Sequence, residues 1–365
     1  MKGTVNKMIN YTSRYEKLRA YMKDNGIDAV YVTSPENFLY MSGYNNPDGH
    51  MLITMTESYS YNDFRYIEAA RAQSFETVKV CPTPEYSMFD VIKSEMIGTI
   101  GVEDTKLTMS GYAALLKGIE GSSCKTVELG ECFTELRAVK EEYEIESIVA
   151  AQRIAEGAFD HILKVINYDM TEIEVAAELE YYMKKHGSEK PAFDTIAVSG
   201  KASSLPHGVP RAVKLERGFL TMDYGAMVNG YCSDMTRTIV IGKADENIKK
   251  VYNTVLKAQL DAEAAIKAGA DCGEIDKVAR DIIYGAGYEG KFGHGLGHGV
   301  GLLIHELPNQ NMRSFGRKLV TGNIVTVEPG IYLEGLYGCR IEDMLAVTDD
   351  GAVNLTNCTK ELIEI

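Results

Sequence analysis

The order of hydrophobic and polar positions predicts an alternating α/β arrangement in the first third of the chain. Residues 14–26 have the period of an amphipathic helix that ends at Gly26, and the apolar run that follows, IDAVYVTS, is typical of a buried strand. Strand-like alternation returns in HMLITMTESYSYND and in ETVKVCPT, and the stretch YIEAARAQ between them has a helical pattern. Helices and strands that alternate in this way indicate an α/β domain.

The pattern then changes to a long helical period. Residues 135–165, ELRAVKEEYEIESIVAAQRIAEGAFDHILKV, predict one charged helix with a single apolar face. Beyond it we expect several strands and three further helices, at 172–186, 246–268 and 273–287. Because no glycine- or serine-rich linker separates the two halves, we expect packed domains, 1–137 and 138–365, with the boundary in the first turn of the long helix.

Length and composition are those of an ordinary globular protein. The chain of 365 residues, of mass 40.3 kDa, is longer than a single hydrophobic core usually supports, which agrees with two domains. A formal charge of −14 repels phosphates and therefore argues against binding of nucleic acid or of an anionic membrane surface. No run is apolar enough for a signal peptide or a membrane span, and seven cysteines without a C-x-x-C pair suit free thiols, so we expect a cytoplasmic protein.

A β-hairpin is predicted in FLTMDYGAMVNGYCSDMTRTIVIG. Two apolar runs flank Asn229 and Gly230, a pair that favours a two-residue turn in which both positions need a positive φ. With this turn Val228 faces Tyr231, and the rest of the cross-strand register follows from that pair.

The predicted register brings two aspartates to one face of the hairpin. Asp223 opposes Thr236 and Asp234 opposes Gly225, so the carboxylates are diagonal neighbours with Cβ atoms about 7 Å apart or less. Carboxylates that share a mostly apolar space repel each other and need a cation, a proton or water. Taken alone, the pair is equally compatible with a solvated sheet face.

Two glutamates interrupt a second pair of apolar strands, in NIVTVEPGIYLEGLYGCRIEDMLAV. Glu328 closes one apolar run just before Pro329 and Gly330, and Glu342 lies inside another. A glutamate in a buried strand is unfavourable unless it is compensated. With the two aspartates, these residues make four carboxylates in apolar strands, which match two divalent cations about 3.5 to 4 Å apart and bridged by shared carboxylates.

Three histidines fall within FGHGLGHGVGLLIHELP, where five glycines occupy alternate positions from 293 to 301. The glycines exclude a zinc-binding helix through His294 and His298, since each would cost about 1 kcal/mol in a helix interior. His305 has no second histidine four residues later, as an H-E-x-x-H protease would, and the glycines do not fit a dinucleotide fingerprint. In an extended chain, one histidine can bind metal while the others face substrate, and the bare glycine backbone lets a strand or ligand approach closely.

The order of these residues resembles the five-ligand signature of the pita-bread metallopeptidases, and the match spans residues 138–365. The matching residues are Asp223, Asp234 in GYCSDMTRT, His298 in HGLGH, Glu328 in VEPG and Glu342 in RIED. The resemblance implies an α+β pita-bread catalytic domain in which Asp223 chelates one metal. It implies that His298 and Glu328 hold the other metal, and that Asp234 and Glu342 bridge the two. NFLYMSGY and DFRY resemble, more weakly, the creatinase-type N-terminal α/β domain.

Within that family the chain looks like the proline-specific branch, the Xaa-Pro aminopeptidases and Xaa-Pro dipeptidases. His207 in SLPHGVP, His294 and His305 match the substrate-side histidines, and Arg340 matches the arginine of the R-x-E motif. We expect Glu328 to shuttle the proton, His305 to stabilise the oxyanion and Arg340 to favour a carboxylate or carbonyl. His207 and His294 are expected to line the proline side. The branch also implies short proline-containing peptides as substrates and a homodimer.

The expected activity is hydrolysis of the Xaa-Pro bond at the N-terminus of peptides, with an Xaa-Pro dipeptidase as the alternative. One imidazole among carboxylates favours Mn²⁺, or Co²⁺, with zinc and iron as further alternatives. Methionine aminopeptidases share the metal ligands but normally lack a large N-terminal domain. The complete ligand set argues against a non-catalytic binding relative and against a creatinase-like, metal-independent hydrolysis of a C–N bond.

Overall fold

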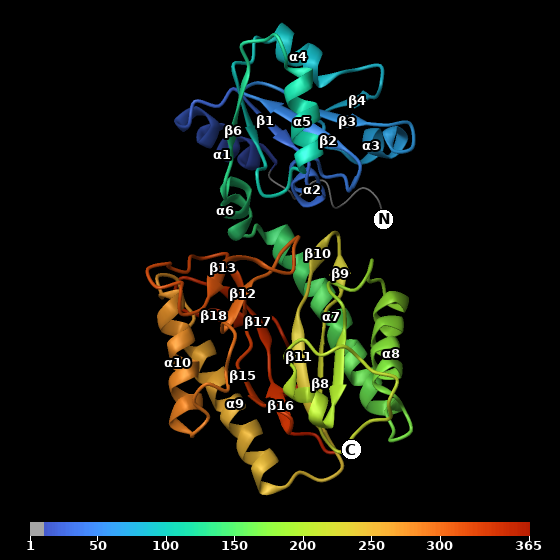
Figure 1. The fold of residues 1–365 in the computed structure, drawn as a ribbon, viewed down its shortest axis with the longest axis vertical. Helices are drawn as coiled ribbons and strands as arrows, with labels where there is room; N and C mark the ends of the chain where they lie inside the picture. The colour runs from blue at the N-terminus through green and yellow to red at the C-terminus, as the bar shows by residue number, and fades with distance from the viewer. Residues whose placement is uncertain (1–10) are drawn as a thin grey trace. The chain divides into compact units, whose positions relative to one another are not determined.

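The computed structural model describes residues 11–365, and the chain divides into two compact units, Met1–Leu136 and Arg137–Ile365 (Figure 1). The first unit is the expected α/β domain, and the second has the helices and largely antiparallel sheets expected of an α+β domain. Within the described residues, no helix has both the length and the apolar character that crossing a membrane requires.

The first unit is a mixed sheet accompanied by helices. Its strands are β1 (Ala29–Val32), β2 (His50–Thr54), β3 (Ser58–Asn62), β4 (Lys79–Pro82), β5 (Thr99–Val102) and β6 (Lys125–Glu128). Its helices are α1 (Tyr11–Asp24), α2 (Pro35–Ser42), α3 (Ile67–Gln73), α4 (Met88–Ser94) and α5 (Met109–Gly118), and α6 (Cys132–Ala138) begins in this unit and ends in the next. The strand order is β4-β3-β2-β1-β5-β6, and β1 pairs parallel with β5 but antiparallel with β2.

Strand β1 is buried on both faces, which explains its continuous apolar sequence. Ala29 packs in a cluster with residues of α4 and α5, whereas Val30 and Val32, which alternate with it, are also fully buried. The prediction of a buried strand in IDAVYVTS is therefore confirmed.

The single long helix predicted for residues 135–165 is wrong, because the structure divides it into α6 and α7 (Glu142–Val165). Between them Val139 bridges Asn323, and the Lys140 N–H donates to the Gly322 carbonyl at 2.8 Å. Glu141 then caps the N-terminus of α7, and its backbone N–H donates to the Glu144 carboxylate at 2.9 Å. Tertiary pairing with a neighbouring loop thus overrides the local helical pattern.

The second unit contains four long helices and twelve strands within the described residues. Its first half comprises α7, α8 (Glu172–Lys185), β7 (Ile196–Ser199), the short 3₁₀ helix η2 (Gly200–Ser204), β8 (Gly218–Tyr224), β9 (Met227–Val228), β10 (Tyr231–Cys232) and β11 (Met235–Ile241). Its second half comprises α9 (Glu246–Ala264), α10 (Cys272–Gly285), β12 (Gly297–Gly299), β13 (Glu306–Gln310), β14 (Ile324–Val327), β15 (Gly330–Leu333), β16 (Tyr337–Arg340), β17 (Asp343–Val347) and β18 (Ala352–Asn354).

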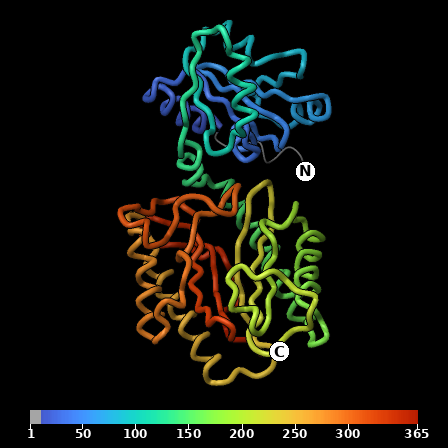
Figure 2. The backbone as a smooth tube through the Cα atoms, viewed as in Figure 1, coloured from blue at the N-terminus to red at the C-terminus, as the bar shows by residue number. Residues whose placement is uncertain are grey.

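Each half of this unit packs one pair of helices on one sheet. Helices α7 and α8 cover the sheet β11-β8-β7, and α9 and α10 pack against the sheet β13-β12-β14-β17-β18 and the β15-β16 ribbon. The strands of the two halves lie between the helix pairs and contact one another at β8 with β16 and at β11 with β17 (Figures 1 and 2). In each half, the strand side chains that point away from the helices therefore face the same space between the two halves of this unit.

Candidate metal centre

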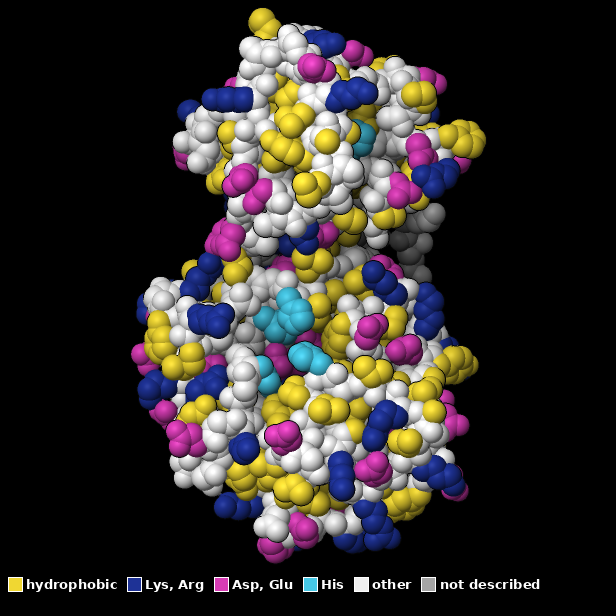
Figure 3. Space-filling view, viewed as in Figure 1, with side chains coloured by type: hydrophobic (Ala, Val, Ile, Leu, Met, Phe, Trp, Pro, Cys, Tyr) yellow, Lys and Arg dark blue, Asp and Glu magenta, His cyan; other side chains and the backbone are white. Residues whose placement is uncertain are grey.

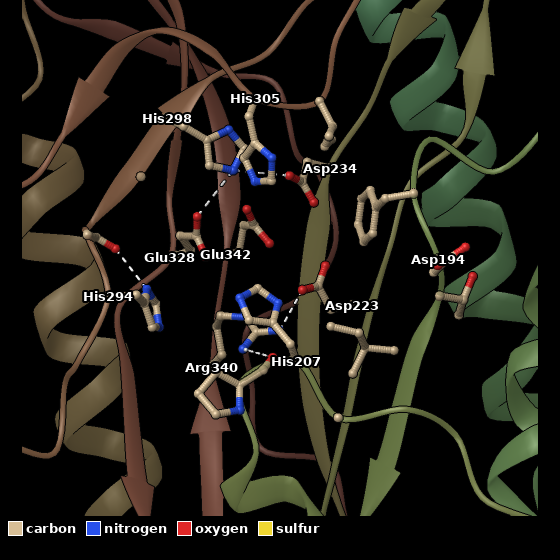
Figure 4. Close-up of a pocket in the computed structure, with 18 of the residues that line it drawn as sticks. Asp194, His207, Asp223, Asp234, His294, His298, His305, Glu328, Arg340 and Glu342 are labelled. Atoms are coloured by element: carbon tan, nitrogen blue, oxygen red, sulfur yellow. Dashed lines mark hydrogen bonds and ion pairs between the residues drawn. The ribbon is translucent and has the colours of Figure 1, made fainter.

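A single cavity of about 680 Å³ in the second unit brings together every site residue that the sequence analysis singled out. The residues that line it include His207, Asp223, Asp234, His294, His298, His305, Glu328, Arg340 and Glu342. Figure 3 shows histidine side chains gathered around a hollow, with acidic side chains inside it. In Figure 4 the carboxylates lie in the middle of the cavity, between His298 and His305 at one end and His207 and Arg340 at the other.

The hairpin register predicted from the sequence is confirmed. Asn229 and Gly230 have φ values of 52° and 80°, and Val228 pairs with Tyr231. Asp223 pairs with Thr236 across β8 and β11, and Asp234 directly precedes β11. Both carboxylates therefore face the cavity.

The two glutamates are brought to the same space by the second sheet. Val327, the residue before Glu328, pairs with Asp343, the residue after Glu342, where β14 meets β17. The side chains of Glu328 and Glu342 then both point at Asp234 and His298 (Figure 4).

His298 lies at the centre of β12, and the glycines around it allow the neighbouring strands to approach. A Cβ at Gly297 would lie 2.1 Å from the Thr326 carbonyl oxygen, and one at Gly299 would lie 2.2 Å from the Leu307 carbonyl oxygen. The glycine pattern thus serves strand packing, with β13 on one side and β14 on the other.

The carboxylates are too crowded to be ionised together without a cation. Burial, followed by repulsion from Asp223, raises the pKa of Asp234 well above its ordinary value, and burial with repulsion from Asp234 does the same to Glu342. Oδ1 of Asp223 and Oε1 of Glu342 are buried without a hydrogen-bond partner. Atoms of Asp234, His298 and Glu342 lie within 4.8 Å of one another, a separation that suits shared metal ligands.

His298 forms an ion pair with Glu328. Its Nε2 lies 3.3 Å from Glu328 Oε1 and 3.6 Å from Asp234 Oδ2, while Nδ1 lies 3.1 Å from the Gly299 carbonyl. Burial lowers the pKa of His298, but Glu328 and Asp234 outweigh it and raise that pKa to about 9. Burial likewise raises the pKa of Glu328, and His298 reverses this and holds it at about 2. Because the carbonyl fixes Nδ1 as a donor, deprotonation leaves the Nε2 lone pair directed at the carboxylates.

Arg340 is held by the protein through four of its N–H groups. Nη2 donates to Asp223 Oδ2 at 2.5 Å and Nε donates to Thr236 Oγ1 at 3.1 Å. Nη1 donates to the Tyr332 hydroxyl at 2.7 Å and to the Pro206 carbonyl at 3.2 Å. A guanidinium has about five N–H donors, so little of Arg340 remains for a substrate.

The Tyr332 hydroxyl links Arg340 to His294. It lies 2.9 Å from His294 Nε2, and His294 Nδ1 lies 2.8 Å from the Gly295 carbonyl. The carbonyl can only accept, so Nδ1 carries the proton and Nε2 accepts from Tyr332. Burial lowers the pKa of His294, which keeps the ring neutral.

The other two histidines stand closer to the opening. The His305 ring lies 4.3 Å from that of His298, and burial, with the nearby positive charge of His298, lowers the pKa of His305. His207 follows η2 and lines the cavity beside Arg340 (Figure 4).

Two further residues that were not predicted from the sequence hold the site. Thr236 donates to Glu342 Oε2 at 2.7 Å, and its place opposite Asp223 in the predicted hairpin was the available signal. Tyr332 pairs with Gly338 across β15 and β16, so it is a diagonal neighbour of Arg340. The alternation in GIYLEGLYGCR carried that information.

Both units match known protein families. Residues 146–349 match the metallopeptidase family M24, and residues 14–139 match the creatinase/prolidase N-terminal domain. The Xaa-Pro dipeptidase of Pyrococcus furiosus is 39% identical over 96% of this chain and 99% of that protein.

Solved structures agree with this similarity. An Xaa-Pro dipeptidase from Bacillus anthracis superposes with a TM-score of 0.93 at 39% identity, over 98% of this chain and 100% of that one. An X-Pro aminopeptidase from Thermotoga maritima gives a TM-score of 0.88 at 35% identity, over 96% of this chain and 100% of that one.

Proposed function

This chain belongs to the metallopeptidase family M24, whose members are dinuclear metal-dependent peptidases, and we propose that it hydrolyses the Xaa-Pro bond at the N-terminus of short peptides. The observation that carries the proposal is the meeting of Asp223, Asp234, His298, Glu328 and Glu342 in one cavity together with three further histidines. Relatives that are similar along their whole length are Xaa-Pro dipeptidases and an X-Pro aminopeptidase.

The residues present fit two divalent cations. Asp223 and Glu342 each have a buried oxygen without a hydrogen-bond partner, and the pKa of Asp234 is raised. Both features indicate a site that lacks positive charge. Asp223, Asp234, His298, Glu328 and Glu342 would hold the two ions. When bound, such ions lower the pKa of a water and polarise a carbonyl. We propose Mn²⁺, since oxygen donors with a single imidazole suit it.

An Xaa-Pro bond calls for recognition by shape. Proline has no backbone N–H and its ring fixes φ, so a substrate strand cannot dock through a regular hydrogen-bond ladder at that residue. The cavity wall contains Phe193, Ile196, Pro206 and Val209, which offer apolar surface for a pyrrolidine ring. His207, which follows Pro206 in the chain, and His294 line the same cavity, and they form the proline side in this proposal.

In this proposal Glu328 moves the proton. Its side chain is 16% exposed, compared with 12% for Asp223 and 6% for Asp234, so it is the most accessible of these three carboxylates. It accepts a proton from the attacking water and returns it to the proline nitrogen, which leaves as a secondary amine because it cannot leave as an amide anion. His305, next to His298, donates to the oxygen that becomes negative in the tetrahedral intermediate.

The cavity lining favours an aminopeptidase over a dipeptidase. Among the described residues that line it, Arg340 is the only lysine or arginine, and Asp223 already neutralises it. The free carboxylate of a dipeptide would therefore meet little fixed positive charge, whereas a longer peptide has an uncharged amide at that position. The cavity of about 680 Å³ also leaves room for chain beyond proline.

The names of the relatives support the dipeptidase as a second candidate. The Pyrococcus furiosus protein and the Bacillus anthracis structure both carry that activity in their names, and each aligns with nearly all of this chain.

The test is a comparison of kcat/KM for Ala-Pro, Ala-Pro amide and Ala-Pro-Ala with Mn²⁺ supplied, and with Ala-Ala-Ala as the control. Ala-Pro amide has the length of the dipeptide without its carboxylate. The aminopeptidase proposal expects the amide and the tripeptide to be cleaved faster than Ala-Pro, and the dipeptidase expects the reverse order. Preference for Ala-Ala-Ala over every proline peptide would reject Xaa-Pro specificity altogether.

A further inference from the structure

Glu306, the residue after His305, is a buried carboxylate with three charged or backbone donors. Its Oε1 accepts from Arg137 Nε at 3.0 Å and from the Leu303 N–H at 3.1 Å, and its Oε2 accepts from Lys140 Nζ at 3.1 Å. The Arg137, Lys140 and Glu306 side chains are at most 2% exposed. A buried cluster of charged side chains adds little to the stability of the fold compared with an apolar cluster. The position of this cluster relative to His305 is therefore more informative about its role than its energy.

The Glu306 carboxylate folds back beneath the turn that leads to His305. A Cβ added at Gly301 would lie 2.4 Å from Glu306 Oε2, so the glycine leaves the space that the carboxylate fills. The same turn is tied on its other side, where the Cys232 N–H donates to the Gly301 carbonyl at 2.8 Å. Residues 301 to 306 are thus held from both sides, and His305 is the member of this segment whose ring meets His298.

The two other substrate-side histidines lie near similar anchors. Asp276, fully buried, accepts from the Leu296 N–H at 2.9 Å and pairs with Arg280, which donates to the His294 carbonyl at 2.9 Å. Glu172, also fully buried, accepts from Arg211, four residues after His207, at 2.8 Å. A buried carboxylate with an arginine therefore recurs at each segment that brings a substrate-side histidine to the cavity.

We propose that Glu306, locked between Arg137 and Lys140, is the positioning residue of His305 and affects turnover only through that histidine. The inference rests on the proposed function, in which His305 stabilises the oxyanion. The His305 ring must donate to an oxygen on which negative charge develops in the transition state, so it has to be held within a few tenths of an ångström. A loosely held turn would lose this stabilisation of the transition state. Arg137 and Lys140 lie where the chain enters the second unit, so this entry segment helps to shape the active site.

The test is a double-mutant cycle of Glu306→Gln with His305→Ala, with kcat, KM and bound metal measured for each variant. Glu306→Gln alone is expected to lower kcat about 10-fold or more, with KM and metal content within about 2-fold of the wild type. In the His305→Ala background the same change should lower kcat less than about 2-fold. An equal fall in both backgrounds, or a loss of metal, would mean that Glu306 acts on the fold as a whole and would overturn the inference.

A second variant covers the case in which Glu306→Gln fails to fold. Gly301→Ala keeps every charge but displaces the Glu306 carboxylate, and it should show the same kinetic pattern. Gly285→Ala is the matched control, because a Cβ there meets nothing within 4 Å. A fall in kcat for Gly301→Ala that persists in the His305→Ala background contradicts the proposal.

Hydrogen exchange separates this inference from the proposed function. The Leu303 amide, bound to Glu306, should exchange faster in both variants than in the wild type, whatever the enzyme cleaves. If no peptide is hydrolysed but this amide loses protection, the proposed function fails and the anchoring stands. Unchanged protection of Leu303 would refute the anchoring itself.

Discussion

Arg340 and Asp223 form an ion pair inside the cavity, with 2.5 Å between Nη2 and Oδ2. From the sequence alone, these residues are expected to have separate roles, Arg340 toward the substrate and Asp223 toward a metal. In the structure the arginine fixes the carboxylate that faces the metal site, and it also ties Tyr332 and Thr236 to it. We infer that Arg340 organises the site at least as much as it contacts a peptide.

Replacing Arg340 with lysine should therefore impair catalysis although the charge is kept. An ammonium is a point donor and cannot reach Asp223, Thr236 and Tyr332 at once, as the planar fork does. We expect kcat/KM to fall about 10- to 100-fold, equivalent to about 1.4 to 2.7 kcal/mol, with most of the metal retained. Steady-state kinetics with metal analysis measures this, and exposed Arg313→Lys is the control. Wild-type kcat/KM in Arg340→Lys would contradict the role of the fork.

Removal of either proposed bridging carboxylate should remove metal and activity together. Asp234 and Glu342 are buried and share a repulsion that a cation would relieve, so Asp234→Ala or Glu342→Ala leaves each ion short of ligands. We expect fewer than two bound ions per chain and a loss of turnover of about 1,000-fold or more. Elemental analysis and a peptide assay test this, with exposed Glu334→Ala as the control. Full turnover in either variant would refute bridging.

The hairpin carboxylates could be placed from the sequence because a two-residue turn determines the register. Asn229 and Gly230 imply one turn type, and period-two alternation then assigns Asp223 and Asp234 to a face without knowledge of the rest of the fold. The glycine run around His298 was likewise sufficient to reject a helix. In both cases the decisive information is local, and the structure confirms it.

The break at Val139 and the hydrogen bond from Arg340 to Pro206 could not be predicted in the same way. The first depends on pairing with Asn323 and the second on the Pro206 carbonyl, and both partners are distant in sequence from the residues they hold. Local helical period predicted a continuous helix because it contains no information about such partners. Resemblance to a family supplied the ligand set as a whole, but not these contacts.

Replacing Tyr332 with phenylalanine should alter substrate binding more than metal binding. The change removes the donor to His294 Nε2 and an acceptor of Arg340 Nη1, and leaves the five proposed ligands in place. We expect KM to rise several-fold and stability to fall by about 1 to 2 kcal/mol, the usual effect of a lost buried hydrogen bond. Kinetics and thermal unfolding measure the two effects. Tyr181→Phe, on the surface, is the control, and an unchanged KM would show that His294 needs no support from Tyr332.

Metal binding should release protons and should strengthen as pH rises. Without metal, burial and mutual repulsion raise the pKa of Asp234 and of Glu342 well above their ordinary values, and Glu328 helps to raise that of His298 to about 9. Near neutral pH His298 therefore holds a proton that a metal must displace, and the raised pKa values of the two carboxyl groups act in the same direction. We expect calorimetric titration with Mn²⁺, repeated in buffers of different ionisation enthalpy, to show net proton release at about pH 6 to 8, with affinity higher at pH 8.

The same shifts predict how stability depends on pH in the metal-free protein. A group whose folded pKa lies above its unfolded pKa stabilises the fold fully below the unfolded value and loses that contribution as pH rises through the folded one. For Asp234 and Glu342 the loss begins above about pH 4, and for His298 it runs from about 6.5 to about 9. Glu328, with its pKa held at about 2, has the opposite sign, but its change falls below about pH 4. The Tm of metal-free protein should therefore decline from about pH 6 to about pH 8 relative to Mn²⁺-loaded protein, which gains affinity over that range. A gap in Tm that stays constant or narrows would mean that these groups do not carry the protons that we assign to them.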